Sequence, residues 1–539
     1  MIVHIIEAVY HFLWGDLVTL HLSGTSIGIP LLVLLLIPTG IYFTFRTNFV
    51  SVRLFPDMVR SLTEKKGNGN SLSPLQTLFV STATRVGMGN LVGVVAAVSA
   101  GGAGAVFWMW LSAILGSATA FIEATLAQIH KEEDSLYGGY HGGPAYYIEK
   151  GLHSKPFAVL FAVVTVLAAG FLCPGVQGNS ITSAFTHAFG LNTAVTTVFV
   201  ISLLCFIIFG GITRIAQFTV VVVPFMAQIY IVAALIIVGV NIDKFPAMLQ
   251  LVFSSAFGVN SMFGAMLGTA VTWGVKRGLY SNEAGQGTGP HASSAAAVSH
   301  PAKQGLVQAF SVYIDTLFVC SATGFMILLT GCYNVIGPNG QTIVNNLPGV
   351  EVGPAYTQAA VETLMPGWGS PFVALALFFF AFTTIVAYYY QAETNIVYLF
   401  RGSKRGAAIF VLRVIFLVGT AYSSMKSADL AWAMGDIGIG MMAWVNFIAI
   451  LLLQGIAFKC LRDYEEQKHL GLDPTFDPAK LGITNAEYWT ESQRETNTIL
   501  EKSSGVDNRV LSTLQEKREL EAAKKGKRTG LFIDNDGDD

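Results

Sequence analysis

Long apolar runs separated by short polar stretches dominate the first 460 residues of the chain. A helix needs about 20 apolar residues to cross the hydrocarbon core of a bilayer. Runs of that length predict an all-α polytopic membrane protein with about 11 transmembrane helices. Their expected ranges are 27–46, 74–99, 104–129, 156–189, 194–213, 217–240, 258–288, 304–332, 370–398, 406–424 and 428–457.

The two ends of the chain differ from these runs. Within residues 1–26, apolar residues from Ile2 to Leu13 recur at helical spacing, which predicts an amphipathic helix lying at the membrane surface. Residues 461–539 hold 29 of the 66 charged residues. This segment is predicted to be a solvated cytoplasmic tail without chemistry of its own.

Composition supports a membrane protein and excludes several other classes. Hydrophobic residues make up 53% of the chain and charged residues 12%, against about 25% charged in soluble domains. A formal net charge of −2 lacks the basic excess typical of nucleic-acid binding. The five cysteines form no CxxC pair, so neither a disulfide framework nor a zinc site is indicated.

Lys and Arg are distributed unevenly between the two sets of loops. If the N-terminus lies outside, fifteen basic residues fall in inner loops or at inner ends of spans, and only Lys244 and Lys426 fall in outer loops. The outer segment 333–369 contains no Lys or Arg. Because cytoplasmic loops carry such an excess, we expect a protein of the cell (inner) membrane with its N-terminus outside and its C-terminus in the cytoplasm.

Two predicted spans contain residues that weaken a helix. In span 74–99, Gly87 and Gly89 lie one residue apart beside Asn90, and glycine destabilises a helix interior. Span 258–288 combines polar residues with glycines, which can instead serve close helix packing. Its residues of interest are Gly264, Gly268, Thr269, Thr272, Trp273, Gly274 and Gly278.

The two weakened spans are five spans apart, which suggests a repeat. Transporters with inverted repeats place a broken helix at corresponding positions of each half, and the freed backbone groups bind ions and substrate there. The chain divides accordingly into two five-helix repeats, 74–240 and 258–457. Span 27–46 is then an extra transmembrane helix outside the repeats.

Four segments resemble the signature sequences of a known family. They are RVGMGNLVGV at 85–94, GGAGAVFWMW at 101–110, GGPAYYIEKGL at 142–152 and GLYSNEAGQGTGPHASSAA at 278–296. The chain thereby resembles the alanine or glycine:cation symporters of prokaryotes from about residue 20 to 458. The resemblance implies the leucine-transporter (LeuT) fold and a sodium-coupled, sometimes proton-coupled, symport of small neutral amino acids. The family commonly has Thr or Ser where this chain has Met88, which leaves the side chain of the substrate open.

An amino-acid substrate is zwitterionic, so its site must bind a carboxylate and an ammonium group away from water. Free N–H groups at a helix break suit the carboxylate, and free carbonyls suit the ammonium group and Na⁺. Gln177 follows Pro174 and Gly175, and its amide can serve a zwitterion or a hydrogen bond between helices. The expected substrate-binding residues are Thr84, Gly87, Met88, Gly89, Asn90, Gln177, Gly268, Thr269, Thr272 and Trp273.

Adjacent threonines within span 370–398 suggest an ion site. The hydroxyls of Thr383 and Thr384 are hard oxygen ligands at bilayer depth. Together with the carbonyls of Ala83 and Val86 they resemble the common sodium site of the LeuT fold. The alternative is that each hydroxyl bonds the backbone of its own helix.

Charged residues within spans need partners, because an unpaired charge in a membrane is costly. We expect Arg85 to form an inner-gate ion pair, and Asp315 to be a cation or proton ligand or a structural partner. Lys276 and Arg277 are expected to reach the inner surface or line an inner vestibule. The candidate partners of Arg85 are Glu123, Glu283, Asp315 and Glu393.

Two enzyme-like motifs have simpler explanations. GTSIG at 24–28 matches GxSxG by chance, and the glycines at 87–93 are not a dinucleotide fingerprint because no βαβ unit surrounds them. We therefore predict a membrane transporter rather than an enzyme, with Na⁺ as the co-transported ion. Alternatives are a proton-coupled or glutamine-type carrier, a channel and a membrane receptor. The sequence gives no oligomeric state.

Overall fold

The computed structural model describes residues 2–22, 25–64, 71–133, 139–259, 266–338, 340–402 and 404–490. Most of them are helical. The elements up to residue 129 are α1 (Ile2–Trp14), β1 (Asp16–Leu22), β2 (Thr25–Pro30), α2 (Leu31–Arg46), α3 (Val50–Arg53), α4 (Phe55–Ser61), α5 (Pro74–Arg85), the π-helical turn η1 (Gly89–Gly93), α6 (Val94–Gly101) and α7 (Gly104–Ile129). Those up to residue 256 are β3 (Glu132–Glu133), β4 (Tyr140–His141), α8 (Pro144–Leu152), α9 (Lys155–Leu167), η2 (Ala168–Leu172), α10 (Cys173–Phe189), α11 (Thr193–Ile208), α12 (Gly211–Val240) and α13 (Phe245–Ala256).

The remaining elements complete the second half of the chain. They are α14 (Leu267–Asn282), α15 (Gly289–Ser294), α16 (Pro301–Tyr313), η4 (Ile314–Cys320), α17 (Ser321–Thr330), β5 (Asn334–Ile336), β6 (Thr342–Asn345), α18 (Pro354–Glu362), α19 (Gly369–Leu399), α20 (Arg405–Ser424) and α21 (Ala428–His469). Each of the three sheets is a two-stranded antiparallel pair: β1 with β2, β3 with β4, and β5 with β6.

Several helices are long and apolar enough to cross a membrane. The described residues contain seven such helices, or eight if α5 and the segment Gly89–Gly101, which meet at 53°, count as one span. Three further predicted spans correspond to helices of 16 residues each, namely α2, α11 and α14. The prediction of a helical, multi-span membrane protein is confirmed, while the count of eleven stays a prediction.

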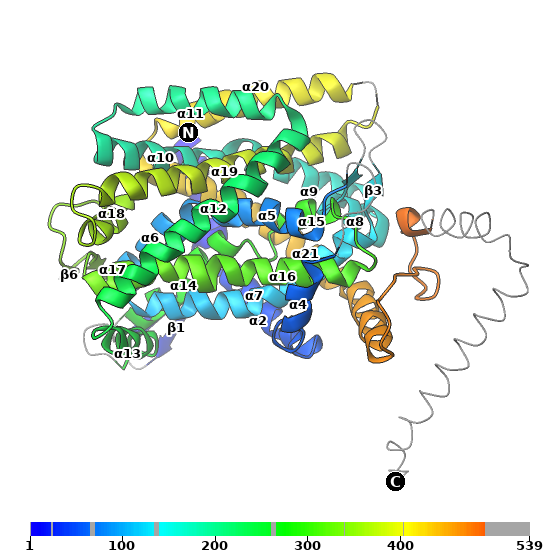
Figure 1. Ribbon diagram of the computed structural model, residues 1–539, viewed down its shortest axis with the longest axis horizontal. Helices are drawn as coiled ribbons and strands as arrows, with labels where there is room; N and C mark the ends of the chain where they lie inside the picture. The colour runs from blue at the N-terminus through cyan, green and yellow to red at the C-terminus, as the bar shows by residue number, and fades with distance from the viewer. Residues whose placement is uncertain are drawn as a thin grey trace, which may run out of the picture.

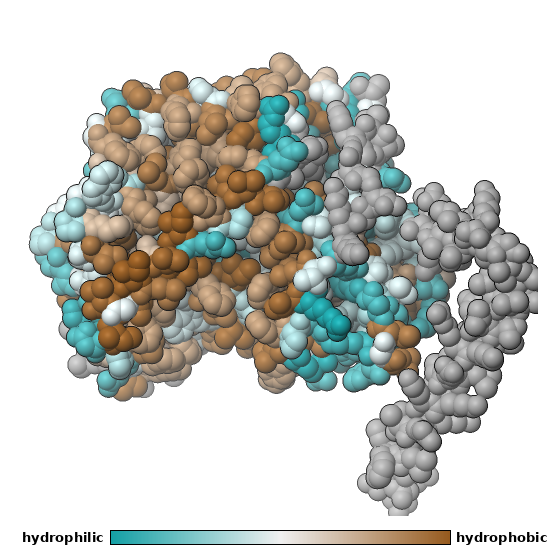
Figure 2. Space-filling model, in the orientation of Figure 1, coloured by the Kyte–Doolittle hydropathy of each residue, from teal (hydrophilic) through white to brown (hydrophobic). Residues whose placement is uncertain are grey.

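The helices lie roughly along one direction, and the connections gather at two ends. Figure 1 shows α13, α18 and β6 at one end and α4, α8 and β3 at the other, which we name the α18 end and the α8 end. Between them the visible surface is mostly hydrophobic, whereas hydrophilic residues gather at the ends (Figure 2). On α12, for example, Val221 is 70% and Phe225 64% exposed. Such a band fits contact with lipid.

The second interrupted helix lies in a different place from the one predicted. Helix α14 runs without a break from Leu267 to Asn282. Its glycines serve packing, since a Cβ added to Gly274 would lie 2.5 Å from the Ala105 carbonyl oxygen of α7, and one on Gly278 would lie 2.1 Å from Ser112 Oγ. The interruption falls at 283–288, between α14 and α15. Gly264 lies outside the described residues.

The N-terminal segment packs into the molecule more deeply than a surface helix would. Leu13 and Trp14 at the end of α1 are buried, and the Trp14 indole donates a 2.9 Å hydrogen bond to the carbonyl of Asp436 in α21. After α1 comes the β1–β2 hairpin, so the first long helix begins at Leu31 and not at residue 27. Residues 27–30, which the hydropathy pattern had assigned to the first span, are instead part of strand β2.

The described part of the C-terminal segment is folded, which corrects the prediction of a solvated tail from residue 461. Helix α21 continues to His469, and residues 470–490, here named the C-terminal strap, turn back along the α8 end (Figure 1). The Phe476 amide donates to the Ser299 carbonyl at 3.1 Å, and the Trp489 indole donates to the Gln128 carbonyl at 2.9 Å. Residues 491–539 lie outside the described residues.

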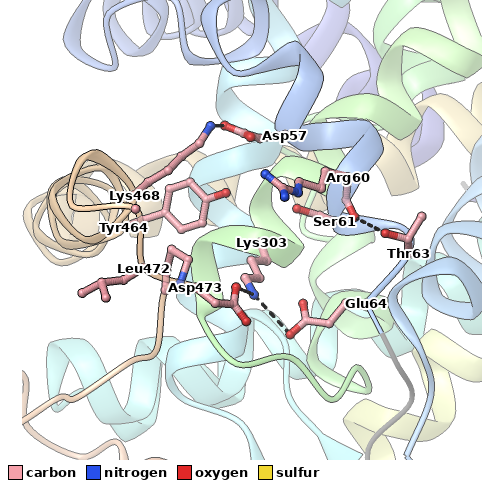
Figure 3. A pocket seen from close by; sticks show the side chains of 12 residues that line it. Asp57, Arg60, Ser61, Thr63, Glu64, Lys303, Tyr464, Lys468, Leu472 and Asp473 are labelled. Atoms are coloured by element: carbon pink, nitrogen blue, oxygen red, sulfur yellow. Dashed lines mark hydrogen bonds and ion pairs between the residues drawn. The ribbon is translucent and has the colours of Figure 1, made fainter.

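A charged cavity of about 540 Å³ separates the start of the strap from α4 and α16. In Figure 3, Lys303 lies between Glu64 and Asp473, with nitrogen–oxygen distances of 3.3 and 2.7 Å, and Lys468 of α21 is paired with Asp57 of α4. These pairs connect the strap and the last turn of α21 to the first half of the chain.

Aromatic residues of the strap also cover Lys131, the buried residue just after α7. Its ammonium nitrogen lies 4.3 Å from the ring centres of Tyr140 and Tyr488 and 5.1 Å from that of Trp489, and it donates to the Ala296 carbonyl at 2.8 Å. Burial lowers the pKa of Lys131, and it lowers the pKa of neighbouring His130 to about 4. The strap therefore holds the end of α7 in a cation–π cage.

Replacing Trp489 should destabilise the α8 end. Trp489→Ala removes the indole hydrogen bond, one wall of the cage and a buried ring, and such truncations cost about 3–5 kcal/mol. We expect a clear fall in the thermal unfolding midpoint of the purified protein. Leu472→Ala is the matched control, because Leu472 belongs to the strap but is 55% exposed. Equal midpoints for the two variants would contradict the role given to Trp489.

Candidate functional site

The first interrupted helix frees backbone groups at the centre of the molecule. Helix α5 ends at Arg85 and η1 begins at Gly89, so Val86, Gly87 and Met88 form the break. The Gly87 amide donates to the Asn90 side-chain oxygen at 2.9 Å, and the Met88 amide donates to that of Gln177 in α10 at 3.0 Å. Side-chain amides thus occupy two N–H groups that a bound carboxylate could accept from instead.

The break is tightly enclosed. Met88 and Asn90 are fully buried and Gln177 is 1% exposed. A Cβ added to Gly87 would lie 2.5 Å from Thr384 Oγ1 and 3.1 Å from Gln177 Oε1, whereas one on Gly89 would lie 3.3 Å from the nearest atom, Ser281 Cα. The absence of a side chain at Gly87 is what lets α10 and α19 approach the same peptide.

The two threonines of α19 have different roles in the structure. Thr384 donates to the Ala83 carbonyl of α5 at 2.9 Å and to the Phe380 carbonyl of its own helix at 3.0 Å. Among the described residues, Thr383 donates only to its own helix, to carbonyls of residues 379 and 380 at 2.9 and 3.0 Å. Thr384 therefore meets Ala83 as the ion-site prediction requires, while Thr383 follows the alternative. Thr84 also bonds its own helix, at the Ser81 carbonyl.

The second interruption, at 283–288, is held by a buried carboxylate that sequence analysis had considered only as a partner of Arg85. Glu123 of α7 accepts hydrogen bonds from the amides of Gly285 at 3.2 Å and Gly287 at 3.1 Å. Its Oε2 also accepts from the Asn446 side chain of α21 at 2.9 Å. The two glycines have φ of +83° and +84°, a conformation that glycine adopts without strain. Glu123 thus satisfies two backbone N–H groups of this interruption, those of Gly285 and Gly287, without water.

Asp315 joins the two interrupted helices. Its carboxylate accepts hydrogen bonds from Asn90 at 2.7 Å, from Ser281 at 2.8 Å and from Thr316 at 2.7 Å. Asn90 lies in η1, directly after the first break, and Ser281 in the last turn of α14. The position of Asp315 suits the predicted cation or proton ligand, and its three donors also make it a structural link.

Four predicted binding residues do not reach the break. Thr272 lies nine residues before Ser281, which corresponds to about 13 Å along a helix, and it donates to the Gly28 carbonyl at 3.1 Å. Trp273 places its ring 5.3 Å from the Lys276 nitrogen and 5.1 Å from the Arg277 guanidinium. Gly268 and Thr269 lie still further from the break, near the start of α14.

A signal in the sequence could have located the second break. Gly285, Gly287 and Gly289 alternate, which repeats the spacing of Gly87 and Gly89 in the first break. Gly274 and Gly278 inside α14 are instead four residues apart, as packing along one helix face requires.

Arg85 is held by neutral acceptors, which corrects the expected ion pair. It donates to the Asn282 carbonyl at 2.7 Å and to the Gln308 side chain at 2.9 Å. Within the described part of the chain, no carboxylate lies within ion-pair distance of Arg85. Its bond to Asn282 ties the end of α5 to the end of α14.

Lys276 and Arg277 form a buried cluster and do not line an inner vestibule. They lie 2.8 and 3.0 Å from the carboxylate of Asp436 in α21. The Arg277 guanidinium lies 4.0 Å from the ring centre of Trp432, and Lys276 donates to the Tyr10 hydroxyl of α1 at 2.6 Å. This cluster joins α14 and α21 beneath the N-terminal helix, so it separates the breaks from that side of the molecule.

Comparison with known proteins gives consistent matches. Residues 16–478 match the model of the sodium:alanine symporter family. The putative sodium/proton-dependent alanine carrier protein YrbD of Bacillus subtilis is 54% identical, over 85% of this chain and 94% of that protein. The sodium/proton-dependent alanine carrier protein of Bacillus sp. PS3 is 51% identical, over 80% and 97%. The probable sodium/glutamine symporter GlnT of Bacillus subtilis is 41% identical, over 87% and 95%.

Solved structures are less similar. A mutant form of the manganese transporter of Eremococcus coleocola is 12% identical with a TM-score of 0.46, and the match covers 82% of this chain and 96% of that one.

The close approach at Gly87 predicts opposite effects for two glycines of the first interrupted helix. Gly87→Ala forces a methyl group onto Thr384 and Gln177, and such overpacking costs about 1–3 kcal/mol. In Gly93→Ala the nearest atom is 4.0 Å away, so alanine there should be neutral or stabilising by up to about 1 kcal/mol. Thermal unfolding of the purified variants should show a lower midpoint for Gly87→Ala alone. Equal midpoints would mean that the break can widen.

Proposed function

Because the chain belongs to the sodium:alanine symporter family, we propose that it couples inward movement of Na⁺ to uptake of a small neutral amino acid, alanine or glycine. The observation that carries this proposal is the pair of N–H groups at the first break. An incoming carboxylate would replace the side-chain oxygens of Asn90 and Gln177 on the amides of Gly87 and Met88. Both side chains would then be free to bind other parts of the substrate.

The enclosure of the site favours a small substrate. Thr384, Gln177 and the fully buried Met88 surround the break. Because little space is left beside Gly87, a methyl or hydrogen side chain suits the site better than a long one. Relatives include a protein named as a glutamine symporter, so a larger substrate remains the second candidate within transport.

The proposed sodium site uses Thr384 together with the carbonyls of Ala83 and Val86, and Thr383 completes it after its hydroxyl turns away from its own helix. Na⁺ would join α19 to the broken helix at the point where Thr384 already contacts Ala83. Binding the ion would thus favour the arrangement in which the amides of Gly87 and Met88, here named the carboxylate cradle, are in place to bind the substrate carboxylate. This shared arrangement supplies the coupling between ion and substrate.

Proton coupling is the second candidate for the driving ion, because two relatives are named sodium/proton-dependent carriers. Asp315 is the proposed proton or second cation ligand, since its buried carboxylate touches both interrupted helices. Three buried carboxylates, Glu123, Glu283 and Asp315, accompany one buried guanidinium, Arg85, around the breaks. This surplus of negative charge favours entry of a cation.

The proposed architecture is that of the LeuT fold, with inverted repeats at 74–240 and 258–457 and an extra helix at 27–46. The breaks at 86–88 and 283–288 support it, since they open the two halves at corresponding positions. We propose that the N-terminus lies outside, so that the cluster around Asp436 closes the outer side. Alternating access then requires that Arg277 and Asp436 separate when the site opens outward.

Uptake by the purified protein in proteoliposomes tests the proposal. An inward Na⁺ gradient should drive labelled alanine above its equilibrium concentration, and unlabelled glycine should compete more strongly than glutamine. A proton gradient without Na⁺ should not support accumulation. Accumulation driven by protons alone would establish the second candidate, and uptake that never exceeds equilibrium would indicate a channel.

Removal of the Thr384 hydroxyl should raise the Na⁺ concentration needed for half-maximal uptake by about tenfold or more, if the lost ligand contributes about 1.4 kcal/mol. Reciprocity requires that alanine binding at fixed Na⁺ weaken as well. Thr384→Val is the variant, and Thr394→Val is the matched control, because Thr394 is buried in the same helix and bonds only its own backbone at the Tyr390 carbonyl. An unchanged Na⁺ dependence in Thr384→Val would move the sodium site elsewhere, with Asp315 and Asn90 as the next candidates.

A further inference from the structure

We propose that Glu283 binds the ammonium group of the substrate. This inference rests on the proposed function, and it assigns a partner to the half of the zwitterion that the N–H groups of the first break cannot bind. Glu283 is the first residue of the second break and is fully buried. A carboxylate in such a place needs a positively charged partner or a full set of hydrogen bonds.

The hydrogen bonds of Glu283 are incomplete. Its Oε1 accepts from the Tyr388 hydroxyl at the long distance of 3.4 Å, and its Oε2 has no hydrogen-bond partner among the described residues. The contrast with Glu123 is sharp, because both oxygens of that neighbouring carboxylate accept from amides. Glu123 is used in holding the loop, whereas Glu283 keeps an oxygen available.

The backbone at Glu283 is also unusual. Its φ is +55°, in the left-handed region that residues with a side chain rarely adopt. Glycine would fit this conformation without strain, yet a glutamate stands here, two residues before Gly285. The conformation is that of a helix C-cap, in which the Glu283 amide donates to the Leu279 carbonyl at 3.0 Å and the chain turns from α14 into the second break.

The surroundings of Glu283 suit a donor with several N–H bonds. The hydroxyls of Thr84 and Thr288 lie beside its carboxylate without a well-formed hydrogen bond to it, because Thr84 donates to the Ser81 carbonyl and Thr288 Oγ1 lacks a partner of good geometry among the described residues. An ammonium group donates three hydrogen bonds and accepts none. Acceptor oxygens from both interrupted helices therefore converge where such a group would be satisfied.

The position relative to the carboxylate cradle agrees with a short α-amino acid. Tyr388, which contacts Glu283, lies one helical turn after Thr384 on α19, and residues four apart share a helix face. Thr384 in turn adjoins Gly87, and Gln177, which caps the Met88 amide, is also a hydrogen-bond partner of Tyr388. Glu283 and the two N–H groups are thus linked through contacts of Tyr388, Thr384 and Gln177.

The experiment measures binding of labelled alanine to the purified full chain in saturating Na⁺, with lactate as a competitor. Lactate keeps the carboxylate and methyl group of alanine and replaces its ammonium group by a hydroxyl. Glu283→Gln should weaken alanine binding at least tenfold while lactate binding changes little, so that the preference for alanine over lactate collapses. Retention of that preference would overturn the proposal.

Two controls separate this role from others. Glu123→Gln, at the buried glutamate of α7 that accepts from the amides of this break, should weaken alanine and lactate equally, because it disturbs the loop and not the ammonium partner. Na⁺ should still stabilise the substrate-free Glu283→Gln protein. This stabilisation is measured as the rise in the thermal unfolding midpoint when Na⁺ is added. Loss of that stabilisation with the preference for alanine intact would make Glu283 an ion ligand and contradict the assignment.

The remaining outcomes are also distinct. If Glu283→Gln does not fold, Glu283→Asp moves the charge back by one methylene and should weaken alanine more than lactate, whereas an equal loss would overturn the proposal. If alanine binds to Glu283→Gln as to the parent while Na⁺-driven uptake persists, only this inference fails. If the parent itself shows no cation-driven uptake, the proposed function fails.

Discussion

A helix that stops inside a membrane leaves backbone N–H and C=O groups that no water can satisfy, and this constraint organises the centre of the molecule. At the first break, the side chains of Asn90 and Gln177 accept from the backbone amides of Gly87 and Met88. At the second break, Glu123 does so. The difference is chemical: neutral amides can be displaced by an incoming carboxylate, whereas a buried carboxylate holds its N–H groups more strongly. The N–H groups of the first break are therefore suited to binding, and those of the second break, held by Glu123, to support.

Polar groups that satisfy these breaks also connect distant parts of the chain. Asp315 links Asn90 to Ser281, and Arg85 links the end of α5 to Asn282. In an apolar environment each of these groups is costly without its partner. The two interrupted helices consequently depend on each other. A ligand that breaks one of these contacts is expected to change the position of both helices.

The sequence predicted the helical membrane architecture and the first break because both depend on local patterns. Runs of apolar residues determine spans, and Gly87 with Gly89 marks a break directly. The second break was placed wrongly, because the glycines of α14 and those at 285 and 287 look alike in sequence. Only the packing of Gly274 and Gly278 against α7 distinguishes them. The different partners of Thr383 and Thr384 likewise depend on which side of α19 meets α5. The fold of the strap was missed because its buried residues, such as Phe476 and Trp489, are widely spaced among polar ones.

The indole of Trp489 has a consequence for the order in which the protein is made. It bonds the carbonyl of Gln128, which is 361 residues earlier in the chain. Ribosomes add about 5–20 residues per second, so the end of α7 is synthesised about 20–70 s before its cover exists. Trp14 is likewise synthesised 422 residues before Asp436, whose carbonyl accepts from its indole. The delay between the two is of similar length. Trp14 and Trp489 thus reach their partners only late in synthesis, after the helices between the bonded positions have been made.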